Sequence, residues 1–365
     1  MASALSSAAA GSGRASARQR ADTPPLPLAL TMGDPAGIGL DITLAAWFAR
    51  EVHDLAPFVL FGDVDALARR AEVLGLDVPT AVVSDPAAAV PHFATRLPVL
   101  PVPCAETAVA GEAQTANARA VIASIEEAVL AVRRGAARAV VTNPIAKSVL
   151  MAEGFPHPGH TDYLGALAEA HFGARNVRPV MLLAADELKV VPLTVHIPLA
   201  RVPQGVTAAD IVATARILAR ALRDDFGLVR PRIAVTGLNP HAGEDGLLGS
   251  EDEAVIAPAI AALAAEGLDV TGPHPADTMF HAAARATYDA ALAMYHDQAL
   301  IPIKTLAFDR GVNVTLGLPF VRTSPDHGTA FSIAGTGKAN ARSLIEALKV
   351  ADAMARRRAS AGARA

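Results

Sequence analysis

The chain has 365 residues, a formal net charge of −4 and a mean hydropathy of +0.33, enough for one large or two medium domains with hydrophobic cores. Interspersed charges of both signs exclude the basic surface of a nucleic-acid-binding protein, and no apolar run approaches the ~20 residues of a membrane span. The single cysteine, Cys104, excludes an intrachain disulfide and any multi-cysteine metal site, so we expect a cytoplasmic protein.

The two ends of the chain differ in composition from the rest. Residues 1–25 are rich in alanine, serine, glycine and arginine, a composition that buries too little apolar area to offset the entropy of ordering. We therefore expect a disordered N-terminal tail. Its arginine and serine content also resembles an organelle transit peptide, although a disordered bacterial N-terminus is the simpler interpretation. Residues 356–365 are expected to form a frayed C-terminal tail.

Between the tails, short apolar runs alternate with longer stretches of helical periodicity. The expected strands lie at 28–32, 58–61, 139–142, 180–183, 233–236 and 291–295, and helical periods cover 115–134, 208–226 and 339–356. This alternation predicts an α/β protein with a largely parallel sheet. No linker interrupts residues 26–355, so we expect one continuous two-lobed catalytic unit with its site in the interlobe cleft, where polar phrases follow the strands.

Two glycine-rich phrases are candidates for a phosphate-binding loop. Gly33-Asp-Pro-Ala-Gly37-Ile-Gly39 lacks the Gly-x-Gly-x-x-Gly fingerprint of classical dinucleotide-binding domains, and either an anion site or a tight structural turn would explain it. Gly335-Thr-Gly-Lys338 is not a P-loop, because Ala339 stands where a magnesium-binding hydroxyl is needed.

Gly159-His160-Thr161 precedes a helix-period run at 163–170. One of these side chains could cap the helix, or both could grip a phosphate together with the helix N-terminus.

A second polar region begins at residue 296 and contains three side chains spaced nine residues apart. Lys304, Asn313 and Arg322 each lie among apolar residues. An unpaired charge in such surroundings is costly, so the sequence predicts a buried anionic partner for the lysine and the arginine.

Three histidines, His196, His241 and His296, each end an apolar, strand-like run. A single histidine after a strand is more often a hydrogen-bonded loop residue than a ligand. Three imidazoles from separate strands, however, can hold a divalent ion and leave one coordination position open for catalysis.

Seven phrases together resemble the PdxA family of 4-hydroxythreonine-4-phosphate dehydrogenases, enzymes of pyridoxal phosphate biosynthesis. They occur in the family's order over about residues 26–355 and begin at Gly33, Thr142, Gly159, Gly237, Pro275, Tyr295 and Arg322. The resemblance implies a two-lobed homodimer with a fold similar to isocitrate and isopropylmalate dehydrogenases, which bind NAD without the classical Rossmann fingerprint.

The resemblance also implies roles for individual residues. His196, His241 and His296 would bind one divalent metal (zinc, magnesium or cobalt), with His296 donated across the dimer interface. The phosphorylated substrate would contact His160, Thr161, Lys304, Asn313 and Arg322. The cofactor, NAD or NADP, would contact Asn239, His327, Gly328, Thr329, Ala330 and Asn340. Candidates for the catalytic proton-handling group are Lys304, Asp277 and Asp297, which the sequence does not separate.

The implied reaction oxidises 4-phosphohydroxy-L-threonine to 2-amino-3-oxo-4-phosphooxybutanoate, which decarboxylates to 3-amino-2-oxopropyl phosphate. A metal that polarises the alcohol and the new ketone suits this chemistry. Two alternatives stay open at this point. One is a paralogous dehydrogenase of D-erythronate or D-threonate 4-phosphate, or of an aromatic dihydrodiol carboxylate; the other is a non-catalytic phosphate-ligand binding protein or an acyltransferase of similar fold.

Overall fold

The computed structural model describes residues 26–157 and 159–362, so the tail predicted for residues 1–25 lies outside the described part. The strands are β1 (Leu28–Thr31), β2 (Phe58–Gly62), β3 (Thr80–Val82), β4 (Leu97–Pro101), β5 (Val140–Thr142), β6 (Val180–Ala184), β7 (Lys189–Pro192), β8 (Arg232–Thr236), β9 (Asp269–His274), β10 (Ala290–Ala293), β11 (Val312–Leu316) and β12 (Arg322–Pro325). The α-helices are α1 (Gly39–Phe48), α2 (Val64–Val73), α3 (Ala118–Arg133), α4 (Lys147–Ala152), α5 (His160–Phe172), α6 (Val202–Gly205), α7 (Ala208–Asp224), α8 (Ala257–Ala265), α9 (Ala276–Met279), α10 (Ala282–Arg285), α11 (His296–Ala307) and α12 (Arg342–Gly362).

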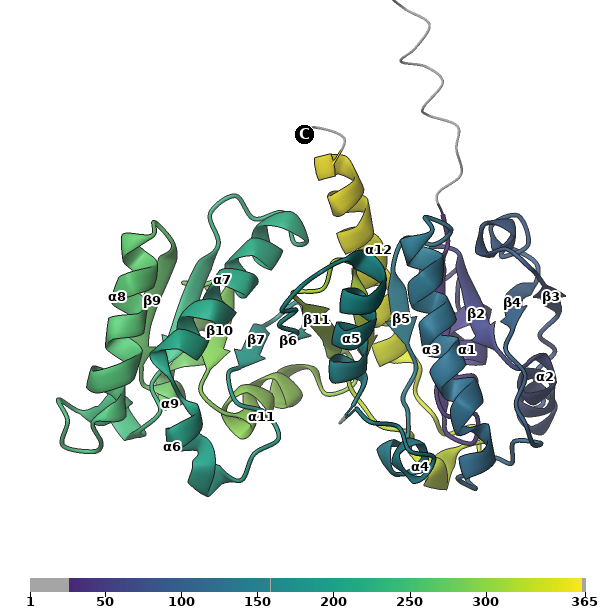
Figure 1. Cartoon of the computed structure of the whole chain (residues 1–365), viewed down its shortest axis with the longest axis horizontal. Coiled ribbons are helices and arrows are strands. Elements are labelled where there is room, and N and C mark those ends of the chain that lie inside the picture. Colours follow the sequence, from purple (N-terminus) through teal and green to yellow (C-terminus); the bar gives the residue numbers. More distant parts are fainter. Residues whose placement is uncertain (1–25, 158, 363–365) are drawn as a thin grey trace, which may run out of the picture.

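All of these strands form one sheet that runs along the long axis of the molecule (Figure 1). The 12-stranded order is β3-β4-β2-β1-β5-β12-β11-β6-β7-β10-β8-β9. The pairs β12–β11, β11–β6 and β6–β7 are antiparallel, and the other neighbours in this order are parallel. The prediction of an α/β fold with a mostly parallel sheet is therefore confirmed. The antiparallel strands lie at the centre and connect the two halves of the sheet by backbone hydrogen bonds.

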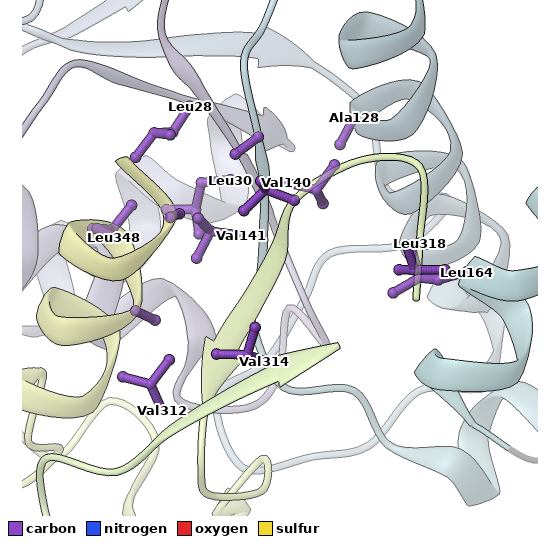
Figure 2. Close-up of a cluster of buried hydrophobic side chains, with 14 of the residues drawn as sticks. Leu28, Leu30, Ala128, Val140, Val141, Leu164, Val312, Val314, Leu318 and Leu348 are labelled. Atoms are coloured by element: carbon purple, nitrogen blue, oxygen red, sulfur yellow. The ribbon is translucent and has the colours of Figure 1, made fainter. Parts of the chain in front are cut away.

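The core forms because the central strands bury apolar side chains on both faces, as expected for a sheet covered by helices on each side. Leu28, Val140 and Val314 are fully buried. Figure 2 shows this cluster with Leu348 of α12 on one side and Ala128 of α3 on the other. Helix α12 packs on β11 and β12, whereas α3 packs on β1 and β2.

The C-terminal segment differs from the sequence-based expectation of a frayed tail at 356–365. Helix α12 continues to Gly362, and only residues 363–365 lie outside the described part. Arg358 explains the difference, because its guanidinium donates to the carboxylate of Asp225, with 3.0 Å between Nη2 and Oδ2. Asp225 is only 2% exposed, so this ion pair anchors the last turns of the helix to the body of the protein.

Among residues 26–157 and 159–362, no helix has the length and apolar character that crossing a membrane requires.

Candidate active site

A pocket of about 270 Å³ opens where β5, β11 and β12 meet the N-terminus of α5. The antiparallel register pairs Asn313 with Ser324, so Asn313, Thr315, Arg322 and Ser324 project from the same face of β11 and β12. The opposite face carries Thr323, whose hydroxyl donates to α12. The lining residues are Thr142, Asn143, Pro144, Ile145, His160, Thr161, Asn313, Arg322, Ser324, Pro325, Asp326, His327 and Gly328.

Arg322 is the buried cation of this pocket, with 3% of its surface exposed. Its Nη1 donates to Thr315 Oγ1 at 2.8 Å and its Nη2 donates to Thr142 Oγ1 at 2.7 Å. Its Nε has no hydrogen-bond partner among the described residues, and both partners of its Nη atoms are hydroxyls and not carboxylates. Burial lowers the pKa of Arg322 to about 10. A buried guanidinium that meets only hydroxyls retains a charge that an anion in the pocket would neutralise.

His160 and Thr161 occupy the first turn of α5, and both line the pocket. Neither supplies a side-chain cap, because Gly159 takes the N-cap position without one, so the capping alternative is wrong. Burial, and then the charge of Arg322, lower the pKa of His160 well below its usual value. Its imidazole is therefore neutral at pH 7. Its buried Nε2 lacks a partner in the described chain, which leaves one ring nitrogen for a ligand.

Asn313 and Lys304 also reach this region, but only Asn313 is left without a partner. Asn313 Oδ1 is buried and accepts no hydrogen bond from the described residues. Lys304 Nζ lies 2.6 Å from Asp326 Oδ2 and donates to the Asp326 carbonyl at 2.7 Å. The predicted need for an external anion therefore applies to Arg322 alone, because Asp326 already neutralises Lys304.

Thr142 and Asn143 line the pocket although sequence reasoning assigned them no role. They belong to the phrase Thr142-Asn-Pro-Ile-Ala-Lys147, which supported the family resemblance. The available signal was its position directly after a predicted strand. What sequence could not supply was the pairing of Thr142 with Arg322, which lies 180 residues away.

The three histidines follow β7, β8 and β10, which are adjacent and parallel in the order β7-β10-β8. The rings of His196 and His296 lie with centroids 5.9 Å apart. Two imidazoles on one tetrahedral zinc have centroids roughly 5 Å apart, given Zn–N distances of about 2.0–2.1 Å, so this pair fits one ion after a small movement. His241 lies on an exposed turn with φ of 51°. Within one chain's described residues, no three His, Cys, Asp or Glu side chains gather closely enough to hold a metal.

This arrangement bears on how a shared metal site would be divided between two chains. The resemblance implied that His296 comes from the partner of the chain that supplies His196. Within one chain the rings of His196 and His296 lie near each other, and His241 lies outside any three-residue group among the described residues.

The two remaining acid–base candidates, Asp277 and Asp297, do not line the pocket that contains Arg322. Asp277 and Asp297 line a separate hollow of about 400 Å³ beside α9 and α11. Asp297 Oδ1 lies 2.7 Å from His296 Nδ1. A carboxylate in this position fixes the imidazole and leaves Nε2 free to bind a metal, so Asp297 is a positioning residue for His296.

Two charged side chains near the start of α5, Lys147 and Asp162, act electrostatically on His196. Burial lowers the pKa of His196, as do, in smaller measure, the charges of Lys147 and His296, whereas Asp162 raises it. A Cβ atom built on Gly159 would lie 3.9 Å from Lys147 Nζ and 4.0 Å from Asp162 Oδ2. The start of α5, next to the pocket, therefore lies within electrostatic reach of His196.

The glycine phrase at Gly33 forms a tight structural turn and not an open anion cradle. Asp34 N, Gly37 N and Ile38 N donate to protein carbonyls, and Ala36 N donates to Asp34 Oδ1 at 3.0 Å. These amides are therefore already used within the fold. A Cβ on Gly33 would lie 2.6 Å from the carbonyl oxygen of Pro144, which explains why this position is a glycine.

Two of the residues expected to bind the cofactor belong to the pocket described above. His327 and Gly328 line the pocket, and burial lowers the pKa of His327. Thr329 and Ala330 follow them, with the Thr329 carbonyl accepting from Ile38 N at 2.9 Å.

Two asparagines of the same set have structural hydrogen bonds. Asn340 Oδ1 accepts from Arg342 N at 2.9 Å, at the start of α12. Asn239 Nδ2 donates to Glu251 at 2.8 Å and to Asp252 at 3.0 Å. Neither bond gives independent support for cofactor binding.

Comparison with known proteins agrees with the sequence resemblance. Residues 54–351 match the family model described as pyridoxal phosphate biosynthetic protein PdxA. The chain is 58% identical over 336 residues to a 4-hydroxythreonine-4-phosphate dehydrogenase from Methylorubrum populi, covering 92% of this chain and 96% of that protein.

Two solved structures resemble the fold. A 4-hydroxythreonine-4-phosphate dehydrogenase from Klebsiella pneumoniae has a TM-score of 0.80 and 37% identity, with 90% of this chain and 99% of that chain covered. A terephthalate 1,2-cis-dihydrodiol dehydrogenase from Burkholderia xenovorans is more distant, with a TM-score of 0.60 and 29% identity over 90% of this chain and 98% of that chain.

Proposed function

The chain belongs to the PdxA family of pyridoxal phosphate biosynthetic proteins, and on this basis we propose that it oxidises 4-phosphohydroxy-L-threonine with NAD or NADP. The product, 2-amino-3-oxo-4-phosphooxybutanoate, loses carbon dioxide to give 3-amino-2-oxopropyl phosphate. The observation that carries the substrate class is Arg322, a buried guanidinium of the pocket whose side-chain partners among the described residues are the hydroxyls of Thr315 and Thr142. A terminal phosphate supplies the missing negative charge.

Phosphate binding uses several groups whose hydrogen-bonding capacity is unused in the structure. Arg322 Nε donates, neutral His160 offers Nε2, and the first-turn amides of α5 present the positive end of a helix. The hydroxyl of Thr161 adds a further donor at the same place. Lys304 would bind or position the substrate together with its partner Asp326, which lines this pocket.

A divalent metal fits the histidine pair. His196 and His296 would hold it, with Asp297 orienting His296 and with His241 as the third ligand. When bound, such an ion acts as a Lewis acid towards an alcohol or ketone oxygen. Zinc, magnesium and cobalt are all compatible with this proposal, although imidazole ligands suit zinc and cobalt better than magnesium.

The nicotinamide cofactor would accept the hydride from the substrate. Its proposed contacts are His327, Gly328, Thr329 and Ala330, which begin at the edge of the phosphate pocket. His327 Nε2 is buried and lacks a partner among the described residues, so it can bond to a ligand.

A homodimer with composite sites accounts for features that one chain leaves unexplained. Ile301 of α11 and Phe308, which directly follows this helix, are 65% and 77% exposed, and Ile301 borders the hollow beside His296. Apolar side chains next to a metal site suit a protein interface. Because His196 and His296 lie together, we assign His241 as the ligand that the partner supplies. A cytoplasmic location is part of the same proposal.

The division of ligands is tested by mixing inactive variants and exchanging subunits. His241→Ala mixed with His296→Ala should regain activity in up to about half of the heterodimer's sites, because one site then receives neither defect. His196→Ala mixed with His296→Ala should stay inactive, because both lie in the same half-site. Recovery in the second mixture would instead place His296 opposite His196, as the resemblance implied.

The function itself is tested by NAD reduction with 4-phosphohydroxy-L-threonine and D-erythronate 4-phosphate side by side. We expect faster turnover of the amino substrate. Preference for erythronate 4-phosphate would indicate the paralogous dehydrogenase, and absence of NADH with either substrate would leave a binding protein or an acyltransferase.

A further inference from the structure

Asn143 lines the pocket and carries a hydrogen-bond acceptor that is unpaired among the described residues. The residue is fully buried at the end of β5 and lines the same pocket as Arg322. Its Oδ1 accepts no hydrogen bond from the described residues. Leaving a buried carbonyl oxygen unpaired is unfavourable, so a native structure that retains one calls for an explanation.

The orientation of the Asn143 amide is fixed by its own hydrogen bonds. Nδ2 donates to the Thr31 carbonyl at 3.0 Å and to Thr43 Oγ1 at 2.8 Å. Thr43 uses its own hydroxyl hydrogen on the Gly39 carbonyl at 2.7 Å, so towards Asn143 it acts as an acceptor. Rotating the amide by 180° would place Oδ1 against these two acceptors. Both amide hydrogens are thus consumed, and Oδ1 remains available only to accept.

The backbone around Asn143 is built to hold it in place. A Cβ atom on Gly33 would lie 2.7 Å from Asn143 Cβ, and one on Gly39 would lie 3.2 Å from it. The turn that follows β1 therefore packs directly against this side chain. The Asn143 side chain is therefore held in one position among the residues that line the pocket.

The proposed substrate offers one lasting donor. Its phosphate and carboxylate are acceptors at neutral pH, and its C3 hydroxyl becomes a ketone, which also only accepts. The C2 ammonium group donates both before and after oxidation. Building on the proposed function, we propose that Asn143 Oδ1 accepts a hydrogen bond from the substrate's C2 ammonium and thereby selects an amino substrate.

The test compares three substrates in wild type and variants. They are 4-phosphohydroxy-L-threonine, D-erythronate 4-phosphate with a hydroxyl at C2, and 3-hydroxy-4-phosphooxybutanoate with no C2 donor. In the wild type, loss of the C2 donor should lower kcat/KM by about 10- to 100-fold, as for a hydrogen bond to a charged group. In Asn143→Ala, kcat/KM for the amino and the donor-free substrate should differ by no more than about twofold. A difference of that size is within the usual scatter of independent, additive effects.

Thr43→Val is the matched control. It removes one partner of Asn143 Nδ2 and disturbs the same buried network, but it leaves Oδ1 in place. The penalty for the missing C2 donor should therefore persist in this variant. If Asn143→Ala does not fold, Asn143→Asp should raise the preference for the amino over the hydroxyl substrate, because a carboxylate attracts an ammonium group more strongly. A purely structural role would lower both activities equally.

Calorimetric binding of the amino and donor-free compounds, measured without NAD, separates this inference from the proposed function. Wild type should bind the amino compound more tightly, and Asn143→Ala should bind both alike. This comparison holds even if no NADH forms with any substrate, a result that would refute only the proposed activity. An unchanged penalty in folded Asn143→Ala, or a raised KM for NAD alone, would overturn the assignment.

Discussion

Replacement of Arg322 by methionine separates a ligand-binding role from a structural one. In the unliganded protein, burial lowers the pKa of Arg322 to about 10, which corresponds to about 3 kcal/mol against the charged form. The variant removes this unfavourable contribution but also loses the hydrogen bonds to Thr315 and Thr142, about 1 kcal/mol each. The opposing contributions nearly cancel. We expect the free energy of unfolding to change by less than about 2 kcal/mol.

The same variant should lose ligand binding. One lost charge-assisted hydrogen bond costs about 2–3 kcal/mol, or roughly 30- to 150-fold in kcat/KM for the phosphorylated substrate. KM for NAD should change little. Phosphate at 100 times its Kd would stabilise the wild type by about 2.7 kcal/mol, a gain that the variant should lack.

The measurements are chemical unfolding with and without inorganic phosphate, together with steady-state kinetics. Arg216→Met is the control, because Arg216 forms an exposed ion pair with Glu266. Both residues lie far along the chain from the residues that line the pocket. It should keep both phosphate stabilisation and activity. The reasoning is refuted if Arg322→Met unfolds more easily by 3 kcal/mol or more and still responds fully to phosphate.

Three further predictions concern pH, metal and the C-terminal helix. His160 is neutral in the fold because burial lowers its pKa below 6.5, so the stability it contributes is complete above pH 6.5 and is lost as pH falls towards the folded pKa. In His160→Gln, the free energy of unfolding should therefore depend less on pH below 6.5 than it does in the wild type. The slopes should differ by at most about 1.4 kcal/mol per pH unit, and parallel curves for the two proteins would contradict this prediction. His241→Ala should abolish turnover and lower bound metal, measured by elemental analysis, and full retention would show that the ligand is misassigned. Arg358→Ala leaves the buried carboxylate of Asp225 without its partner and should destabilise the protein by about 2 kcal/mol in urea unfolding, whereas exposed Arg356→Ala should cost under about 0.5 kcal/mol. Equal effects of the two arginines would support the frayed tail expected from the sequence.

Much of the architecture was accessible from local patterns. The apolar runs that became β1, β2, β5, β6, β8 and β10 were located to within a few residues, because each is a short buried segment bounded by polar residues. Strands β11 and β12 were not recognised, although they carry Asn313 and Arg322. Their polar pocket-facing residues interrupt the apolar pattern on which strand prediction depends.

The sequence alone determined the family, the fold class and the chemistry-bearing phrases, since these depend on residue identity and order along the chain. It did not determine which partners those residues meet. Only the tertiary structure gave Lys304 its carboxylate in Asp326 and left Arg322 with hydroxyl partners alone among the described side chains. It likewise set His296 beside His196 and placed Asn143, whose Oδ1 is unpaired among the described residues, in the lining of the pocket. Each of these facts depends on segments that are distant in sequence and are joined by strand pairing, which local propensity does not encode.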